Sequence, residues 1–351
     1  MTLQIEKFNN INLDDEFFDS LKNSYKEFNE WFENKGKNGE SAYISKEDYD
    51  ITGFLYLKLE TEEHKDINPS LKSKKRTKIG TFKIDARGTK MGERFVKKIF
   101  DHATHHEVEE VYVTIFPEFQ TLINLLERYG FERHGTKTTE NGTEIVYLKK
   151  IDMLFDYDLV KTYPLIDNKN GNSHLIAIQP KWHTRLLPDS ILKNEDERDL
   201  IEDISHTNSI HKVYLCNMSG VENINPGDRI LIYRPGETDP KWFKSVATSI
   251  CVAEEYKNIN EFKSKDDFIK YCAPYSVFTQ EELEKFWKEK KYPHIIKFMY
   301  NVALRKRPNM RSLVEDFGFD RTAYWGYREI SNAQLAEIAI AGGINESLII
   351  D

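Results

Sequence analysis

The segment FKIDARGTKMGERFVKKIFDHA, residues 82–103, passes from alternating strand-like residues through two glycines into an amphipathic helix pattern. The N-terminus of a helix carries about half a positive charge, and its first backbone N–H groups have no partner within the helix. Gly88 and Gly92 would let a ligand approach the backbone closely, and Arg87 and Lys90 add positive charge. The segment therefore predicts either a phosphate site at this helix start or a tight turn that carries surface cations.

The length and composition indicate a globular protein of two domains. The chain has 351 residues, of which 39% are hydrophobic and 31% are charged. No segment approaches the roughly 18 apolar residues of a membrane helix, so we expect a cytoplasmic protein. The net charge of -8 argues against general coating of a polyanion. Positive charge is nevertheless concentrated in residues 51–100, which hold thirteen Lys and Arg against six Asp and Glu.

The first half of the chain alternates helix and strand patterns. Aromatic and aliphatic residues recur at helical spacing over residues 14–35, which predicts one or two amphipathic helices. The later patterns predict strands at 41–45, 50–60, 79–85, 108–116, 130–137 and 143–150, and helices at 92–106 and 119–130. The predicted order is α-β-β-β-α-β-α-β-β.

Two motifs narrow this α/β class. Neither GxGxxG nor GxxxxGK[ST] occurs, which excludes a Rossmann fingerprint and a P-loop. The run from Arg87 to Gly92 resembles the phosphate loop of GNAT acetyltransferases, [R/Q]-x-x-G-x-[G/A], with Lys90 where that family usually has glycine. The helix ending in YGF, within LLERYGFERHG at residues 125–135, is a second similarity. The resemblance covers about residues 1–150.

The resemblance implies a GNAT fold, with a central mixed sheet and flanking helices, and acetyl-CoA as cofactor. Its pyrophosphate would bind backbone N–H groups of residues 88–93, and its pantetheine arm would follow residues 80–85, where that strand splays from residues 111–116. The basic run Lys72–Lys78 could reach the 3′-phosphate or an RNA backbone, or form a solvated loop tip. The implied cofactor-binding residues are Phe82, Ile84, Arg87, Gly88, Thr89, Lys90, Met91, Gly92 and Glu93.

Acetyl transfer to an amine needs a deprotonated amine, a polarised thioester carbonyl and a protonated leaving thiolate. Many GNAT enzymes place a tyrosine acid shortly before the Gly-Phe pair, and here that position is Leu126. Tyr129 is the remaining candidate acid, or else a packed aromatic residue at the helix end. Asp85 and Glu60 are candidate bases, and much of the rate can come from positioning alone.

Cysteines and histidines do not predict a metal centre. Cys216, Cys251 and Cys272 are odd in number and widely spaced, so we expect buried thiols. His102 and His106 stand at i, i+4 and could share a metal ion, but no third ligand is evident near them. A histidine cluster favoured by the dipole at a helix end is the alternative that we prefer.

The second half resembles the PUA-like superfamily, which includes ASCH and EVE modules. A linker is expected at residues 151–172, followed by strands at 173–179, 211–217, 227–235 and 245–255, and by helices near 259–272, 279–290, 311–317 and 331–340. The turn at Gly227 and Asp228 before a strand carries the resemblance, while the GxKxxExR signature of many ASCH domains is absent. The implied fold of residues 173–351 is an α+β β-barrel.

Such modules often read RNA, which needs aromatic platforms and cations. Trp325 and Tyr327 could stack a base beside Arg328, or could be core residues. Further cations occur within residues 181–185 and at Arg305, Arg307 and Arg311. The sequence thus predicts an acetyl-CoA-dependent N-acetyltransferase whose second domain recruits RNA or an RNA-bound acceptor. The alternative is a catalytically decayed transferase that serves as a nucleic-acid-binding or toxin- or defence-associated module.

Overall fold

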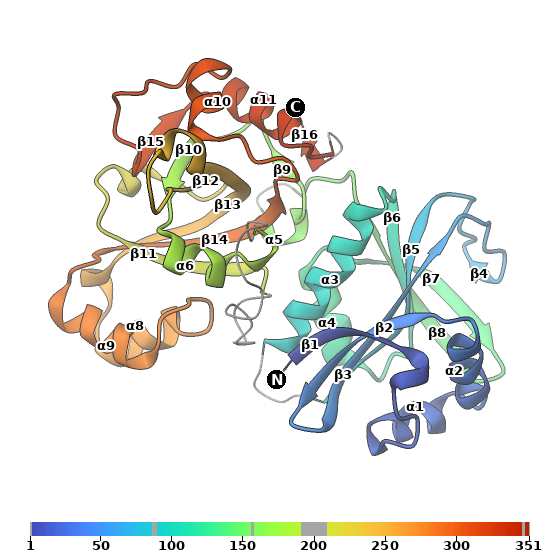
Figure 1. Ribbon diagram of the computed structural model, residues 1–351. Helices are drawn as coiled ribbons and strands as arrows, with labels where there is room; N and C mark the ends of the chain where they lie inside the picture. Colours follow the sequence, from blue (N-terminus) through green and yellow to red (C-terminus); the bar gives the residue numbers. More distant parts are fainter. Residues whose placement is uncertain (1, 86–89, 156–157, 191–208, 346–347, 351) are drawn as a thin grey trace. The chain divides into compact units, whose positions relative to one another are not determined.

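The computed structural model describes residues 2–85, 90–155, 158–190, 209–345 and 348–350. The chain divides into two compact units, Met1–Met153 and Leu154–Asp351 (Figure 1). The range expected to be a linker contains α5 (Leu159–Thr162) and β9 (Ile166–Asp167). In the part of the chain that the structure describes, no helix has the length and apolar character needed to cross a bilayer.

Unit 1 is built on an eight-stranded mixed sheet with the order β1-β2-β3-β5-β6-β8-β7-β4. Every neighbouring pair is antiparallel except β5 and β6. The strands are β1 (Thr2–Lys7), β2 (Ser41–Glu47), β3 (Asp50–Glu60), β4 (Ile67–Asn68), β5 (Arg76–Ile84), β6 (Glu110–Ile115), β7 (Glu132–Thr139) and β8 (Gly142–Lys150). The helices are α1 (Asp19–Ser24), α2 (Phe28–Lys37), α3 (Met91–His105) and α4 (Gln120–Arg128).

Helices cover both faces of this sheet (Figure 1). On one face, Phe54 and Tyr56 of β3 join a buried aromatic cluster with Phe18, Phe28 and Phe32 from the α1–α2 region. On the other face a Cβ atom at Gly53 would lie 2.5 Å from the Phe95 ring of α3. Because side chains alternate along a strand, β3 supplies the core on both sides.

The predicted element order for unit 1 is confirmed, with two additions. The structure adds β1 at one edge of the sheet and the two-residue β4 at the other. The apolar–polar alternation of β1 covers only residues 3–6, and Ile5 is 65% exposed, so this edge strand carries a weak sequence signal. The predicted closure of α4 is confirmed, because Gly130 follows it with a φ of 81°.

Unit 2 contains a six-stranded sheet with the order β11-β14-β13-β12-β10-β15 and a small pair, β16 with β9. Its strands beyond β9 are β10 (Ser173–Ala177), β11 (His211–Cys216), β12 (Arg229–Arg234), β13 (Val246–Asn258), β14 (His294–Ala303), β15 (Tyr327–Ile330) and β16 (Ile349–Ile350). Its helices beyond α5 are α6 (Pro180–Leu186), α7 (Lys241–Lys244), α8 (Lys265–Cys272), α9 (Gln280–Glu289), α10 (Met310–Glu315) and α11 (Asn332–Ala341).

The expectation of a closed barrel in unit 2 is corrected by this strand order. Strands β11 and β15 are the two edges, and no ladder joins them among the described strands. Tyr214 of β11 and Tyr327 of β15 nevertheless belong to one core cluster, so the sheet is strongly curled. Strand β14 was also not predicted, because its burial does not alternate and an apolar run of this kind has no clear period.

Candidate functional site

Strands β5 and β6 form a fork in the middle of the unit 1 sheet. Their parallel ladder runs from the pair Arg76 and Glu110 to the pair Ile79 and Val113. Beyond it β5 continues to Ile84 and pairs only with β3, while β6 continues beside β8. The predicted splay between these strands is therefore confirmed. It leaves backbone groups on the inner side of each strand without a ladder partner, as a site for an extended ligand requires.

A β-bulge lies where the fork opens. In the β3–β5 ladder Tyr56 pairs with Thr81 and Leu57 pairs with Ile79, so Gly80 is the extra residue of β5. A Cβ atom at Gly80 would lie 2.7 Å from the Tyr56 ring, which explains the glycine. Bulges redirect a strand and are common beside active sites. An isolated glycine inside a strand pattern was the sequence signal for this feature.

The start of α3 is described from Lys90 onward, and Arg87, Gly88 and Thr89 lie outside the described residues. Met91 is fully buried, and a Cβ atom at Gly92 would lie 2.7 Å from Leu125 Cδ2 of α4. Glycine at position 92 thus permits the observed close packing between the two helices. A role of Gly92 in phosphate binding would be additional to this role in packing.

Glu93 places a buried carboxylate in the first turn of α3. It is 4% exposed, and its Oε1 lies 3.6 Å from Arg128 Nη1 and 3.8 Å from Lys90 Nζ. A carboxylate at this position complements the helix dipole by itself. A phosphate bound here would therefore have to contact backbone N–H groups on the side facing the loop.

The other residues predicted on β5 divide between the two faces. Phe82 and Ile84 are half-buried, and the Phe82 ring lies 5.6 Å from Phe95 of α3. Asp85 follows the strand, has a 53% exposed side chain and pairs with Lys83 at 3.2 Å. Because Lys83 also contacts the Phe17 carbonyl, Asp85 is held toward the α1–α2 face.

Neither residue at the expected acid position is accessible. Leu126 and Tyr129 are both fully buried, and the Tyr129 ring packs 6.4 Å from Phe100 of α3. The Tyr129 carbonyl accepts a 2.7 Å hydrogen bond from Lys149 Nζ of β8. This placement favours the packed-aromatic interpretation of Tyr129 over a role as acid.

The structure shows another tyrosine beside the end of β6. The Tyr25 ring lies 5.4 Å from Phe116, and its hydroxyl donates a 2.9 Å hydrogen bond to Glu144 Oε1. Burial, followed by Glu144 and the nearby Glu118 and Glu27, raises the pKa of Tyr25. The hydroxyl therefore keeps its proton at neutral pH. The sequence offered no signal for this group, because its members lie 119 residues apart.

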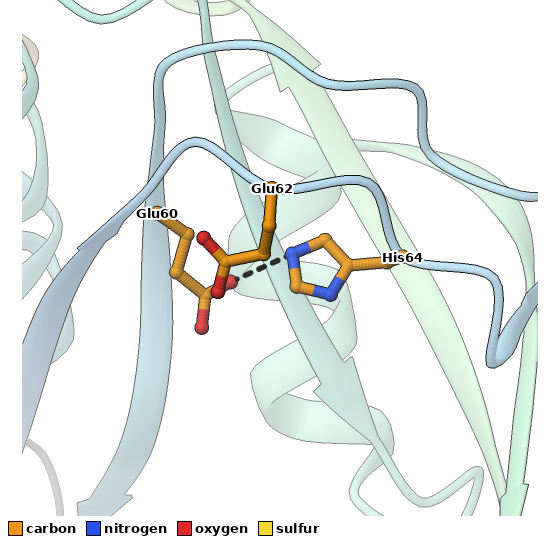
Figure 2. Close-up of side chains that lie close together, drawn as sticks. All are labelled: Glu60, Glu62 and His64. Carbon is orange, nitrogen blue, oxygen red and sulfur yellow. Dashed lines mark ion pairs between the residues drawn. The ribbon is translucent and has the colours of Figure 1, made fainter.

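Glu60, the second candidate base, lies at the closed end of the fork. It pairs with Arg76 in the ladder and forms a cluster with Glu62 and His64, in which ligand atoms lie within 4.8 Å of one another (Figure 2). Its oxygens are already bound by Lys58 at 3.0 Å, by His64 at 3.0 Å and by the Tyr112 hydroxyl. Glu60 is buried, His64 is half-buried and Glu62 is exposed, so a metal ion here would have to displace the existing partners of Glu60.

The histidines at the end of α3 form a second polar group. His102 Nδ1 lies 3.0 Å from Thr77 Oγ1, and the His102 and His106 rings are 4.4 Å apart. Burial, then His106 and His105, lowers the pKa of His102 to about 4. His102 is therefore neutral at neutral pH, which differs from the dipole-stabilised cation that we expected.

This lowered pKa predicts that acid destabilises unit 1 through His102. The unfolded chain binds a proton near pH 6.5 and the folded chain only near pH 4, so stability falls as the pH drops through this window. His102→Gln should remove about 1–2 kcal/mol of the loss between pH 7 and 4.5, after allowance for solvent screening. Urea unfolding of the full chain, with the unit 1 transition assigned by hydrogen exchange of α3, measures this. His134→Gln on β7 is the control, at a half-buried ring that lies 2.9 Å from the Pro69 carbonyl oxygen, and an equal effect in both variants would contradict the assignment.

Several cations of the basic run Lys72–Lys78 are buried or already paired within the protein. Arg76 is 1% exposed and bonds to Glu110 Oε2 at 2.8 Å, while Lys74 bonds to Glu110 Oε1 at 3.0 Å. Burial lowers the pKa of Lys78, whose Nζ lies 5.7 Å from the centre of the Tyr112 ring. The run therefore offers fewer solvated cations than its composition suggests.

In unit 2 the residues predicted to stack a base lie in different environments. Tyr327 is 8% exposed, and its hydroxyl lies 3.1 Å from His174 Nδ1, while His174 Nε2 lies 3.0 Å from Asp228. This burial leaves little open ring surface for stacking. Trp325 is partly exposed, and the Arg328 guanidinium lies 5.5 Å from the centre of its ring.

The predicted cations of unit 2 also differ in exposure. Arg305 is exposed and Arg307 is half-buried. Arg311 pairs with Glu315 at 2.6 Å on the surface of α10. Of residues 181–185, His183 is fully buried, and Lys181 Nζ lies 4.4 Å from the centre of the Trp182 ring. The expectation for the cysteines is confirmed, because all three are free and buried.

No family model and no curated protein matches this chain. Solved structures that this chain resembles include the NatC complex bound to Gag peptide and CoA, at 16% identity and a TM-score of 0.30 over 43% of this chain and 99% of that chain. The ribosomal-protein-alanine N-acetyltransferase from Brucella melitensis has 14% identity and a TM-score of 0.32 with the same coverage. A mutant ZmASCH protein from Zymomonas mobilis has 8% identity and a TM-score of 0.31 over 48% of this chain and 96% of that chain. These TM-scores are too low to add to what the strand order shows.

Proposed function

We propose that unit 1 is an acetyl-CoA-dependent N-acetyltransferase and that unit 2 recruits RNA or an RNA-bound acceptor to it. The observation that carries the proposal is the fork between β5 and β6, which opens at the Gly80 bulge. The strand that leaves this fork leads through the Arg87 to Gly92 motif into α3. The pantetheine arm would hydrogen-bond to the free edge of β5, and the pyrophosphate would lie at the start of α3.

The chemistry that we propose uses positioning and a protonated tyrosine. Holding the amine against the thioester carbonyl supplies much of the rate enhancement. Tyr25, beside the end of β6, is the described hydroxyl that we assign to hydrogen bonding of the leaving thiolate, in place of Leu126 and Tyr129. Its raised pKa makes it a weak acid, so the thiolate takes up the proton that the acceptor amine releases. The carboxylates Glu27, Glu118 and Glu144 near Tyr25 would attract an acceptor that arrives as an ammonium ion.

Calorimetry with acetyl-CoA tests the cofactor assignment. We expect binding to the full chain, and Arg87→Glu should weaken it roughly ten-fold or more, because it exchanges a phosphate partner for a repelling charge. Lys65→Glu, at a side chain that is 82% exposed in the loop before β4, is the matched control and should leave binding unchanged. Undetectable binding to the wild type, or equal binding to Arg87→Glu, would reject the assignment. Gly92→Asp is a poor test, because the clash with Leu125 would perturb packing.

A second function is supported by the buried Leu126 and Tyr129, which leave the usual acid position without a reactive group. In this alternative unit 1 binds acetyl-CoA but transfers nothing, and the chain serves as a nucleic-acid-binding or defence-associated module. Labelled acetyl transfer to a panel of amines and aminoacyl-tRNA separates the two functions. Binding of acetyl-CoA with no transfer to any acceptor would favour the inactive form.

A further inference from the structure

Unit 2 contains a cavity of about 660 Å³ within its own fold. Its lining comes from the ends of β10, β11 and β12 and from the segment before β15. Ring-bearing side chains dominate it, including Trp182, Tyr214, Tyr233, Tyr292, Tyr324 and Trp325. The volume is in the range of small-molecule sites, which are mostly apolar with a few placed polar groups.

One of these polar groups is the Tyr214 hydroxyl. Tyr214 is 6% exposed, and no hydrogen-bond partner for its hydroxyl is found among the described residues. Burial raises the pKa of Tyr214, so the hydroxyl remains a donor at neutral pH. A ligand in the cavity could accept a hydrogen bond from this hydroxyl.

Two aromatic rings at the mouth differ in how firmly they are held. Trp325 is fixed by the Tyr233 ring at 5.1 Å, by the Phe319 ring at 5.9 Å and by an indole N–H bond to the Arg321 carbonyl. Tyr324 is 60% exposed, and its hydroxyl occupies the space that a Cβ atom at residue 326 would take. Gly326 is therefore what lets the Tyr324 ring lie over the chain at the cavity mouth.

The charges around the cavity restrict the ligand further. Lys181 and Lys241 are the charged groups among its described lining residues, which include no aspartate, glutamate or histidine. This excess of positive charge disfavours a cationic ligand and favours an anionic one. Burial raises the pKa of the Cys216 thiol in the lining to about 12, so it is not a nucleophile.

We propose that this cavity binds one nucleotide unit, with the base against the Trp325 and Tyr324 rings, a base acceptor atom on the Tyr214 hydroxyl, and the phosphate near Lys181 and Lys241. Stacking on aromatic side chains is available to every base, and the lysines select the phosphorylated form. The nucleotide is either free or part of an RNA strand. This cavity would be the place where unit 2 binds RNA, as proposed above, and binding there does not depend on acetyl transfer.

Titration calorimetry of the full chain tests this inference, with acetyl-CoA present at saturation so that its adenine cannot confuse the result. The probes are 5′-CMP and 5′-AMP, the matching nucleosides, ribose 5-phosphate and a short single-stranded RNA. We expect the nucleotides to bind more tightly than the nucleosides, and ribose 5-phosphate not to bind. If RNA alone binds and the variants below weaken it, the source is a strand; if the nucleotides bind as tightly as RNA, it is a free nucleotide.

Three variants locate the site. Tyr324→Ala at an exposed ring should weaken nucleotide binding about 5- to 100-fold, and Tyr214→Phe should weaken it about two- to ten-fold. Lys181→Ala with Lys241→Ala should reduce nucleotide affinity to that of the nucleoside. Tyr49→Phe, at a 94% exposed ring in unit 1, and Lys285→Ala on α9 are controls. No binding of any probe, or RNA binding that all three variants retain, would overturn the proposal.

Discussion

Replacing Gly80 by valine is expected to abolish acetyl transfer by unit 1. The valine Cβ would meet the Tyr56 ring at 2.7 Å, so either the ring or the bulge of β5 must move. Because the fork with β6 opens at this residue, a shift of the bulge displaces the edge on which we place the thioester. A displacement of about 1 Å at a reacting centre costs roughly a hundred-fold in rate, and we expect a loss of at least that size. Labelled acetyl transfer at saturating acetyl-CoA measures it.

A second substitution separates this effect from simple misfolding. Overpacking at Gly80 should itself cost about 1–3 kcal/mol of stability. Gly80→Val with Tyr56→Ala removes the ring that the new side chain meets, so the bulge no longer has to move. Loss of the buried Tyr56 ring costs about 3–5 kcal/mol by itself, so we expect the double variant to be less stable than the single one and yet to regain activity. Thr138→Val, at an exposed position of β7, is the control for adding a valine to a strand. Full activity in a folded Gly80→Val variant would show that the bulge is not part of the site.

The sequence predicts the surroundings of this site better than the site itself. The helical spacing that includes Phe28 and Phe32 predicts the aromatic face now seen against β3, because a single helix can display its apolar stripe in its own sequence. The clash partner of Gly80 is Tyr56, 24 residues earlier, and is set by strand pairing. Long-range register of this kind leaves no local periodicity. The burial of Tyr129 likewise depends on Phe100 of another helix.

In unit 2, too, the sequence predicts local patterns but not the long-range pairing of strands. The sequence predicts that Trp325 and Tyr327 either stack a base beside Arg328 or are core residues. The strand begins only at Tyr327, so Trp325 belongs to the preceding segment and lines the cavity while Tyr327 enters the core. The curled open sheet has the strands of the predicted barrel without its closure. Closure depends on hydrogen bonds between edge strands, and a strand pattern does not encode them.

Glu110→Gln is expected to destabilise unit 1 more than any surface substitution. Glu110 is 5% exposed and receives hydrogen bonds from Arg76 and Lys74 at the closed end of the fork. Although burial opposes it, these bonds hold the pKa of Glu110 below its usual value, so the carboxylate is charged at neutral pH. The glutamine would leave the fully buried Arg76 guanidinium without its counter-charge, which typically costs about 3–5 kcal/mol.

Glu109→Gln supplies a matched control on the neighbouring residue. Glu109 lies 3.6 Å from the same Lys74 but has a 57% exposed side chain, so its ion pair is screened and should contribute below about 1 kcal/mol. Urea unfolding, with the unit 1 transition assigned by hydrogen exchange of β5 and β6, compares the two variants. Equal losses of unfolding free energy in the two variants would show that the buried pair of Glu110 with Arg76 contributes no more than the exposed pair of Glu109 with Lys74. A large loss confined to Glu110→Gln would show that the buried ion pair anchors the parallel ladder at its first residue pair, Arg76 and Glu110.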